Sequence, residues 1–132
     1  MPTRTLPLFP LNTVLFPGGL LPLQIFEPRY RAMLADALAR DRLIGMVLLR
    51  PGWEADYEGR PPIFPVGCAG VVTHAERLPD GRANIVLRGV QKFHVEGEQP
   101  GRPYRLAVVR PIAETPGEGD RERLRELWPR LE

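Results

Sequence analysis

The chain opens with a run that is both strongly apolar and rich in proline. Residues 6–26 read LPLFPLNTVLFPGGLLPLQIF. Proline has no backbone N–H to donate, so it is excluded from helix interiors and central strands but tolerated at strand ends, edges and bulges. The prolines therefore predict three short extended pieces, LPLF, VLF and LLPLQIF, with a turn at Gly18-Gly19 before the last piece. Such segments belong at the rim of a small β-barrel or sandwich.

The rest of the chain predicts one amphipathic helix and several more strands. Four apolar residues within 28–40 recur at helical spacing and should face the core. They are Tyr30, Met33, Leu34 and Leu38. Gly89 is expected to interrupt one strand as a bulge or sharp bend. Six or seven strands should curl into a mainly β fold, a closed or partly open barrel with one packed helix. The strands expected after the helix cover residues 43–49, 66–78, 82–88, 91–96 and 104–112.

Size and composition favour a single globular domain. The 132 residues are 43% hydrophobic and 26% charged, which allows a core of reasonable size without disulfides. We place this domain at residues 1–116 and expect residues 117–132 to begin a helical extension. The single cysteine, Cys68, excludes an internal disulfide and favours a cytoplasmic protein. No apolar run reaches the length needed to cross a membrane.

The charge pattern argues against nucleic acid as a partner. Eighteen basic residues face sixteen acidic ones, a net charge of +2. The arginines are scattered singly along most of the chain, whereas a protein that follows a phosphate backbone concentrates them on one face.

The residues needed for common catalytic sites are missing. The sequence has no serine and only one lysine, Lys92, which excludes serine nucleophiles and a phosphate-binding P-loop. Cys68 and His74 lie six positions apart on one predicted strand, about 20 Å at strand spacing, too far for a catalytic dyad. Cys68 is expected in the core. We therefore predict no catalytic residue, no metal ligand, no cofactor and no enzymatic activity.

Aromatic side chains near turns and in a long loop are candidates for binding protein. The proline-rich loop at residues 50–65 is long enough to suggest a function, and aromatic residues on loops are good interface anchors. The candidates are Phe16, Trp53, Tyr57 and Phe64, with Phe9, Leu20 and Ile63 beside them. The structural alternative is that these side chains plug the ends of the barrel.

The C-terminal residues predict a short amphipathic helix whose apolar side needs a cover. Its stripe consists of Leu124, Leu127, Trp128 and Leu131. A helix this short is marginal alone, and Pro129 disturbs it further. The stripe could pack on the barrel, pair with a second copy of the chain to form a homo-oligomer, or dock onto chain absent from this sequence.

Two stretches carry a family resemblance. LPLFPLNTVLFPGGLLPLQIFEPRYRAML and VGCAGVVTHAERLPDGRANIVLRGVQKFHV resemble the Lon protease N-terminal (substrate-binding) domain family in its stand-alone, cereblon-like form. The second stretch ends in the Gly-x-x-x-Phe pattern, here Gly89 to Phe93. The resemblance runs from about Leu6 to Ile112 and implies a PUA-like barrel, usually followed by a helical part.

The resemblance implies a non-catalytic module that binds unfolded or extended protein segments, with a protease or ATPase as a further partner. In full-length Lon, separate ATPase and Ser–Lys peptidase domains do the chemistry, and their motifs are absent here. An RNA-binding PUA-like module is the alternative, although fold analogy does not transfer function. A small hydrolase or transferase would need a polar pocket with converging titratable groups, which the sequence does not predict.

Overall fold

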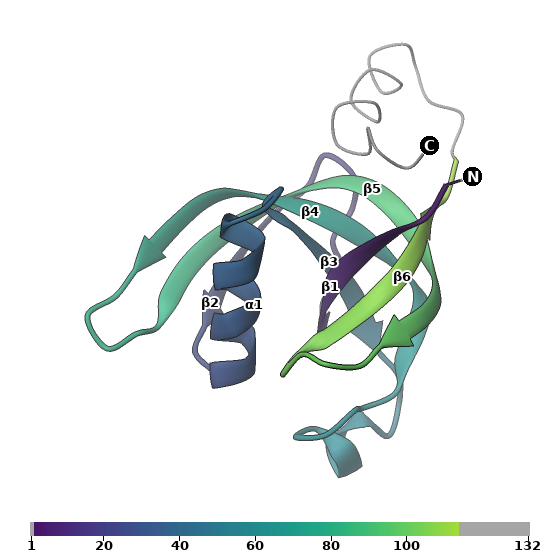
Figure 1. Ribbon diagram of the computed structural model, residues 1–132, viewed down its shortest axis with the longest axis horizontal. Helices are drawn as coiled ribbons and strands as arrows, with labels where there is room; N and C mark the ends of the chain where they lie inside the picture. Colours follow the sequence, from purple (N-terminus) through teal and green to yellow (C-terminus); the bar gives the residue numbers. More distant parts are fainter. Residues whose placement is uncertain (1, 114–132) are drawn as a thin grey trace.

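The computed structural model describes residues 2–113. They form six β-strands, one α-helix and a short 3-10 helix. Figure 1 shows a curled sheet on one side of the molecule and a long β-hairpin that extends from it, with the α-helix between the two. The elements are β1 (Arg4–Leu11), β2 (Leu20–Ile25), α1 (Pro28–Leu38), β3 (Leu43–Leu49), η1 (Trp53–Asp56), β4 (Ile63–Arg77), β5 (Ala83–Gln99) and β6 (Arg105–Pro111).

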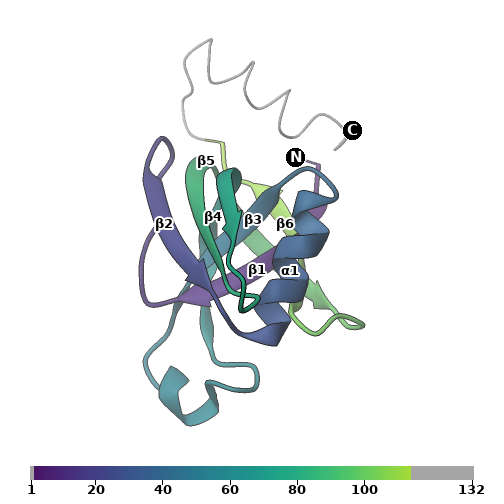
Figure 2. The ribbon, with the colours of Figure 1, turned by 90° about the vertical axis from the view of Figure 1, so that its left-hand side faces the viewer.

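Five strands close into a ring and the sixth is added outside it. The sheet order is β2-β5-β4-β3-β1-β6, and β5 also pairs with β6, which closes the ring. The ring contains one parallel pair, β1 with β3, and its other pairs are antiparallel. β2 pairs with the first half of β5, from Leu20 opposite Arg88 to Ile25 opposite Ala83. In Figure 2, β2 lies on one flank of the β4–β5 hairpin and α1 on the other. The predicted β-barrel with one packed helix is confirmed.

The two prolines of β1 lie inside a strand that has neighbours on both sides, and the stagger of these neighbours explains why they fit. Arg4 to Leu8 pair with β6, and Leu8 to Leu11 pair with β3. Pro7 therefore has a paired strand on its β6 side only, and Pro10 on its β3 side only. Each proline lacks an N–H donor, and each has one side of the strand where no ladder bond is required.

The ring encloses a small apolar core with an aromatic side chain at its centre. Phe93 is fully buried there. Two inward-facing glycines make room for it, because a Cβ on Gly45 would lie 3.0 Å from Cζ of Phe93 and one on Gly67 would lie 2.8 Å from the same atom. The remaining members of this core are Leu6, Leu8, Leu43, Val47, Ala69, Ala107 and Val109.

A second core lies outside the ring, beneath α1 and the β2–β5 pair. Tyr30, Met33 and Leu34 of α1 are buried in it as predicted, and Leu38 packs against its margin. Ala37 completes the buried stripe of the helix. The hydroxyl of Tyr104 donates a hydrogen bond to the carboxylate of Asp36, which joins the helix to the start of β6. Burial, followed by this bond, raises the pKa of Tyr104 to about 12.

Several predicted boundaries differ from the structure. The VLF piece at 14–16 is not a strand, because it turns across the outside of the ring instead of joining a ladder. β4 begins at Ile63, so part of the predicted 50–65 loop belongs to the sheet. Phe9 is a core residue and not a surface anchor, since it is 5% exposed and its ring lies 4.4 Å from that of Tyr30.

Other predictions are confirmed by the same description. β3 spans residues 43–49 and is buried on both faces. The β4–β5 hairpin turns at residues 79–81 as expected. Gly89 lies at a bulge, since Ala69 pairs with Gln91 and the next residue of β4 pairs with Gly89. Within residues 2–113, no helix is long and apolar enough to cross a membrane.

We expect Gly67→Ala to destabilise the barrel because the added methyl group has no space. Its Cβ would lie 2.2 Å from the carbonyl oxygen of Met46, a backbone atom that cannot rotate away. Overpacking of this kind costs about 1–3 kcal/mol, so urea denaturation should show a loss of that size. Gly97→Ala is the control, because no atom lies within 4 Å of its added Cβ. Equal stability of the two variants would contradict this account of the core.

Candidate functional site

The long loop between β3 and β4, residues 50–62, is tied to the start of α1, and we call it the tied loop. Arg29 donates from Nη2 to the carbonyl of Tyr57 (2.9 Å) and from Nη1 to that of Gly59 (3.0 Å). Glu27, the residue that precedes the helix, accepts from the Tyr57 hydroxyl (2.7 Å) and from Nε of Arg29 (3.1 Å). The hydrogen bond to Glu27 raises the pKa of Tyr57 to about 12, with burial adding to the shift. The loop is thereby fastened to the start of α1.

The end of the same loop is tied to the β5–β6 hairpin. Arg105 forms a bidentate pair with Glu98, with N–O distances of 2.9 and 2.8 Å, and donates to the carbonyl of Pro61 at 2.6 Å. Arg60 reaches the same carboxylate at 2.6 Å. Hydrogen bonding from Arg105, with that from Arg60, holds the pKa of Glu98 below its usual value in spite of partial burial. These ion pairs attach the end of the loop to the β5–β6 hairpin.

A tight turn on the outside of the ring presents Phe16 to solvent. The N–H of Gly18 donates to the carbonyl of Gly89 (2.7 Å), and the N–H of Gly89 donates to the carbonyl of Gly19 (2.8 Å). A Cβ on Gly89 would lie only 2.0 Å from the carbonyl oxygen of Phe16. Glycine at this position therefore lets the turn lie directly on β5. The side chain of Phe16 points outward and is 63% exposed.

An apolar groove lies beside this turn, and we call it the Phe16 groove. It has a volume of about 150 Å³, comparable to a cavity that holds a benzene ring. The 13–16 segment forms one wall, and the outer faces of β3, β4 and β5 form the other. The lining residues are Thr13, Val14, Leu15, Phe16, Met46, Leu48, Val66, Gly67, Cys68 and Lys92.

Several residues that line the Phe16 groove, or lie close to the lining residues along the chain, are exposed and apolar. Val14 is 50% exposed, Val66 44%, and Leu20, at the far end of the turn, 66%. Phe64 is 38% exposed and precedes Val66 by two positions on β4, so both lie on the same face of that strand. The guanidinium of Arg50 lies over the ring of Phe64, 5.3 Å from its centre.

The structure separates the four predicted anchors into two groups. Phe16 lines the groove and Phe64 lies next to it along β4. Trp53 and Tyr57 lie on the tied loop, where their rings make an edge contact at 5.6 Å. The predicted interface residues Leu124, Leu127, Trp128 and Leu131 and the proposed extension at 117–132 lie outside the described residues.

Sequence reasoning missed Val66 and the floor of the groove. The signal was available in β4, where Phe64, Val66 and Cys68 alternate with residues that face the barrel interior. Cys68 is 3% exposed, as predicted, but it belongs to the outer core.

Among residues 2–113, no group of three His, Cys, Asp or Glu side chains is arranged to hold a metal ion.

The sequence matches one family over almost its whole length. Residues 5–130 match the substrate-binding domain of ATP-dependent protease La (LON). The chain belongs to this family. The match covers the substrate-binding domain alone, and the stand-alone, cereblon-like form stays a prediction.

Relatives of this LON substrate-binding domain are much longer proteins. A Lon protease from Flavobacterium johnsoniae is 29% identical over 120 residues, which cover 89% of this chain and 15% of the relative. Lon protease 2 from Myxococcus xanthus is 31% identical over 107 residues, covering 80% of this chain and 13% of the relative. The chain thus spans about one seventh of the length of these relatives.

Solved structures of LON N-terminal domains share the fold. A crystal structure of a Lon N-terminal domain protein from Xanthomonas campestris is 25% identical, with a TM-score of 0.69, over 86% of this chain and 62% of that chain. The N-terminal domain of the Mycobacterium avium complex Lon protease, at 17% identity, has a TM-score of 0.65 over 86% of this chain and 57% of that chain.

In this LON domain we expect Glu98→Gln to lower stability at neutral pH and to have a smaller effect in acid. The pKa of Glu98 is lowered by folding, so its contribution is present above the ordinary value of about 4.3 and is lost as the pH falls through the folded-state value. For a partly solvated pair the loss should be about 1 kcal/mol. Urea denaturation at pH 7 and pH 3 measures it.

Glu54→Gln is the matched control, because Glu54 is an exposed residue of η1 on the same loop. Its effect should be small at both pH values. An effect of Glu98→Gln that is equally large at pH 3 would show that the ionised pair is not its source.

Proposed function

We propose that the domain recognises protein substrates by binding an apolar side chain of an extended or unfolded segment in the Phe16 groove. The observation that carries this proposal is the groove itself, an open apolar hollow with a strongly exposed phenylalanine at its rim. Membership of the LON substrate-binding family supports it.

The energetics favour capture of apolar side chains. Exposed apolar surface that is gathered around a hollow is a usual mark of an interaction site. Full burial of one large apolar side chain is worth about 1.5–3 kcal/mol, and an aromatic anchor at the rim gains area in the same event. Binding of this kind depends little on the sequence of the segment, as suits a module that recognises many unfolded chains.

The groove is a better docking place than the open edge of β2. β2 pairs with β5 on one side, and its other side could in principle accept an added strand. Pro22 stands in the middle of β2, and proline on an edge strand is a usual protection against such pairing. The groove has no comparable obstacle.

RNA binding remains the alternative function, and six of the thirteen arginines within residues 2–113 give it little support. Arginines at positions 4, 29, 60, 82, 105 and 110 all form ion pairs with carboxylates. A phosphate backbone would have to displace these carboxylates. RNA binding would fall steeply with salt, whereas apolar capture would not.

In this proposal the module supports proteolysis but does not catalyse it. The curated relatives are Lon proteases, and this chain matches about one seventh of their length. We propose that it delivers segments to a protease or ATPase in the cytoplasm. The same proposal divides the chain into a barrel at 1–116 and a helical extension at 117–132. The apolar stripe of this extension would contact the barrel, a second copy of the chain or such a partner.

We expect Phe16→Ala to weaken peptide binding by roughly tenfold, the effect of losing about 1.4 kcal/mol from an anchor. The probe is a blocked, neutral, leucine-rich peptide followed by fluorescence anisotropy. Phe16 is mostly exposed, so thermal melting should be unchanged. Phe26→Ala is the matched control, since Phe26 is 56% exposed and lies outside the groove lining.

The same assay tests the tied loop. Trp53→Ala should weaken binding only if the loop belongs to the recognition surface, as its aromatic residues suggest. Unchanged affinity in Phe16→Ala would contradict the groove proposal. Binding to RNA that is lost between low and moderate salt, without binding to the peptide, would favour the alternative.

A further inference from the structure

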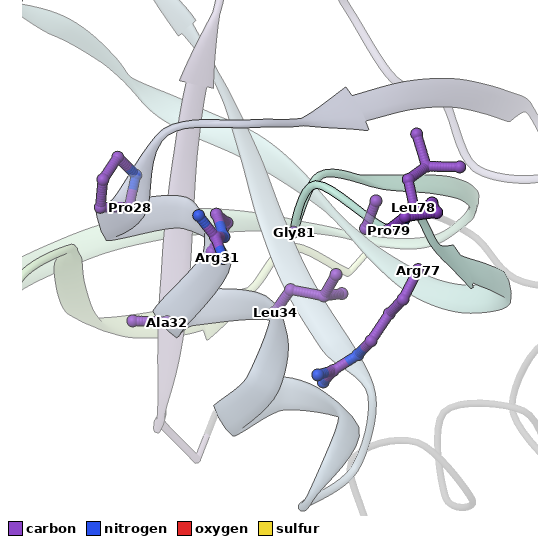
Figure 3. Close-up of a pocket in the computed structure, with 9 residues that line it drawn as sticks. Pro28, Arg31, Ala32, Leu34, Arg77, Leu78, Pro79 and Gly81 are labelled. Atoms are coloured by element: carbon purple, nitrogen blue, oxygen red, sulfur yellow. The ribbon is translucent and has the colours of Figure 1, made fainter.

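A second hollow lies between the first turns of α1 and the tip of the β4–β5 hairpin. We call it the helix–hairpin pocket. Its volume is about 560 Å³, within the range of roughly 300–1,000 Å³ that is usual for ligand sites. Figure 3 shows Leu34 pointing from the helix toward the hairpin and Arg77 reaching from the hairpin back toward the helix. The lining residues are Pro28, Arg31, Ala32, Leu34, Arg77, Leu78, Pro79, Gly81 and Ala83.

The pocket combines two positive charges with an apolar lining. Arg31 comes from α1 and Arg77 from β4, and within residues 2–113 neither guanidinium has an ion-pair partner. Nearby Asp80, at the hairpin turn, is instead paired with Arg82, at 2.6 Å. The helix–hairpin pocket therefore has a positive charge that the domain itself does not neutralise.

The hairpin turn is shaped to admit the side chain of Arg31. Gly81 has a φ of +89°, and a Cβ on it would lie 2.3 Å from Nη2 of Arg31. Glycine is favoured here by the left-handed backbone, and its missing side chain leaves the space that the guanidinium of Arg31 occupies. The guanidinium of Arg31 therefore lies close to the hairpin turn, at the edge of the pocket.

We infer that the helix–hairpin pocket binds an aspartate or glutamate side chain that has an apolar neighbour in an extended protein segment. Guanidinium groups form strong, charge-assisted hydrogen bonds with carboxylates, and the apolar lining suits the neighbouring side chain. The inference rests on the proposed function in that the segment belongs to a protein substrate. It adds a preference for acidic residues to the apolar capture proposed for the Phe16 groove.

The lining favours a peptide over a nucleic acid. Single-stranded nucleic acids are bound by aromatic side chains that stack on the bases, alongside positive charges. No aromatic residue lines this pocket, whose apolar surface comes from leucine, alanine and proline. Aliphatic surface next to a pair of arginines matches a carboxylate with an aliphatic neighbour.

The test compares two peptides on the purified 132-residue chain. Both peptides are acetylated, amidated and labelled with a neutral dye. One alternates leucine with glutamate, and the other has glutamine in place of every glutamate. At low ionic strength the glutamate peptide should bind on the order of tenfold more tightly, as expected for hydrogen bonds to a charged group. Arg31→Gln/Arg77→Gln should remove this preference and leave the affinity for the glutamine peptide unchanged.

The matched control is Arg40→Gln/Arg102→Gln. It removes the same charge at two exposed arginines that do not line the pocket, so the preference for glutamate should persist. Preserved melting temperatures show that each variant is folded.

Three results would overturn the inference: no preference in the parent chain, a preference that survives in the pocket variant, or an equal loss in the control. Competition by a single-stranded RNA that depends on Arg31 and Arg77 would also overturn it, by making the pocket a phosphate site. Failure of the Phe16 groove would be seen separately, because it would change binding of the glutamine peptide.

Discussion

The bulge in β5 at Gly89 is the constraint on which the other parts of this domain depend. Before the bulge β5 pairs with β2 and β4, and after it β5 pairs with β4 and β6, so one strand belongs both to the closed ring and to the outer hairpin. The missing side chain at the same position lets the turn that carries Phe16 lie on the strand through two backbone hydrogen bonds. Ring closure, the outer core and the candidate groove therefore meet at one residue.

Several of the domain's ion pairs attach the long loop between β3 and β4 to the rest of the fold. Glu27 and Glu98 fasten the second half of the long loop through Arg29, Arg60 and Arg105. Ion pairs of this kind restrict a loop more than they stabilise a fold, because much of the Coulomb energy is offset by lost solvation. The domain also exposes an apolar rim at the Phe16 groove and, at the helix–hairpin pocket, guanidinium groups without ion-pair partners among residues 2–113. Both features suit the recognition of chain segments.

Alternation and turn chemistry made most of the fold predictable from sequence. The uninterrupted apolar run of β3, the helix stripe from Tyr30 to Leu38 and the turn at 79–81 each depend on local patterns that tertiary contacts reinforce. The stagger of β3 and β6 along β1 depends on pairing between segments that are far apart in the sequence. Only the structure therefore explains how Pro7 and Pro10 fit inside a strand. The site was harder for the same reason. Phe16 could be named from the turn that follows it. The groove, however, is formed only when three strands lie side by side, and Arg31 and Arg77 line one pocket only when the hairpin lies next to the helix.

The pairing of the first strand with the last also affects how the chain can be made. Arg4 lies opposite Val109, so during synthesis the opening apolar segment must wait for about a hundred further residues before its ladder with β6 can form. Such non-local closure is slow and leaves strand edges open to aggregation. Pro7 and Pro10 interrupt the row of donors on that waiting segment, and proline at such positions disfavours pairing with other nascent chains. The prolines that shape the folded barrel are thus also suited to protect it before it exists.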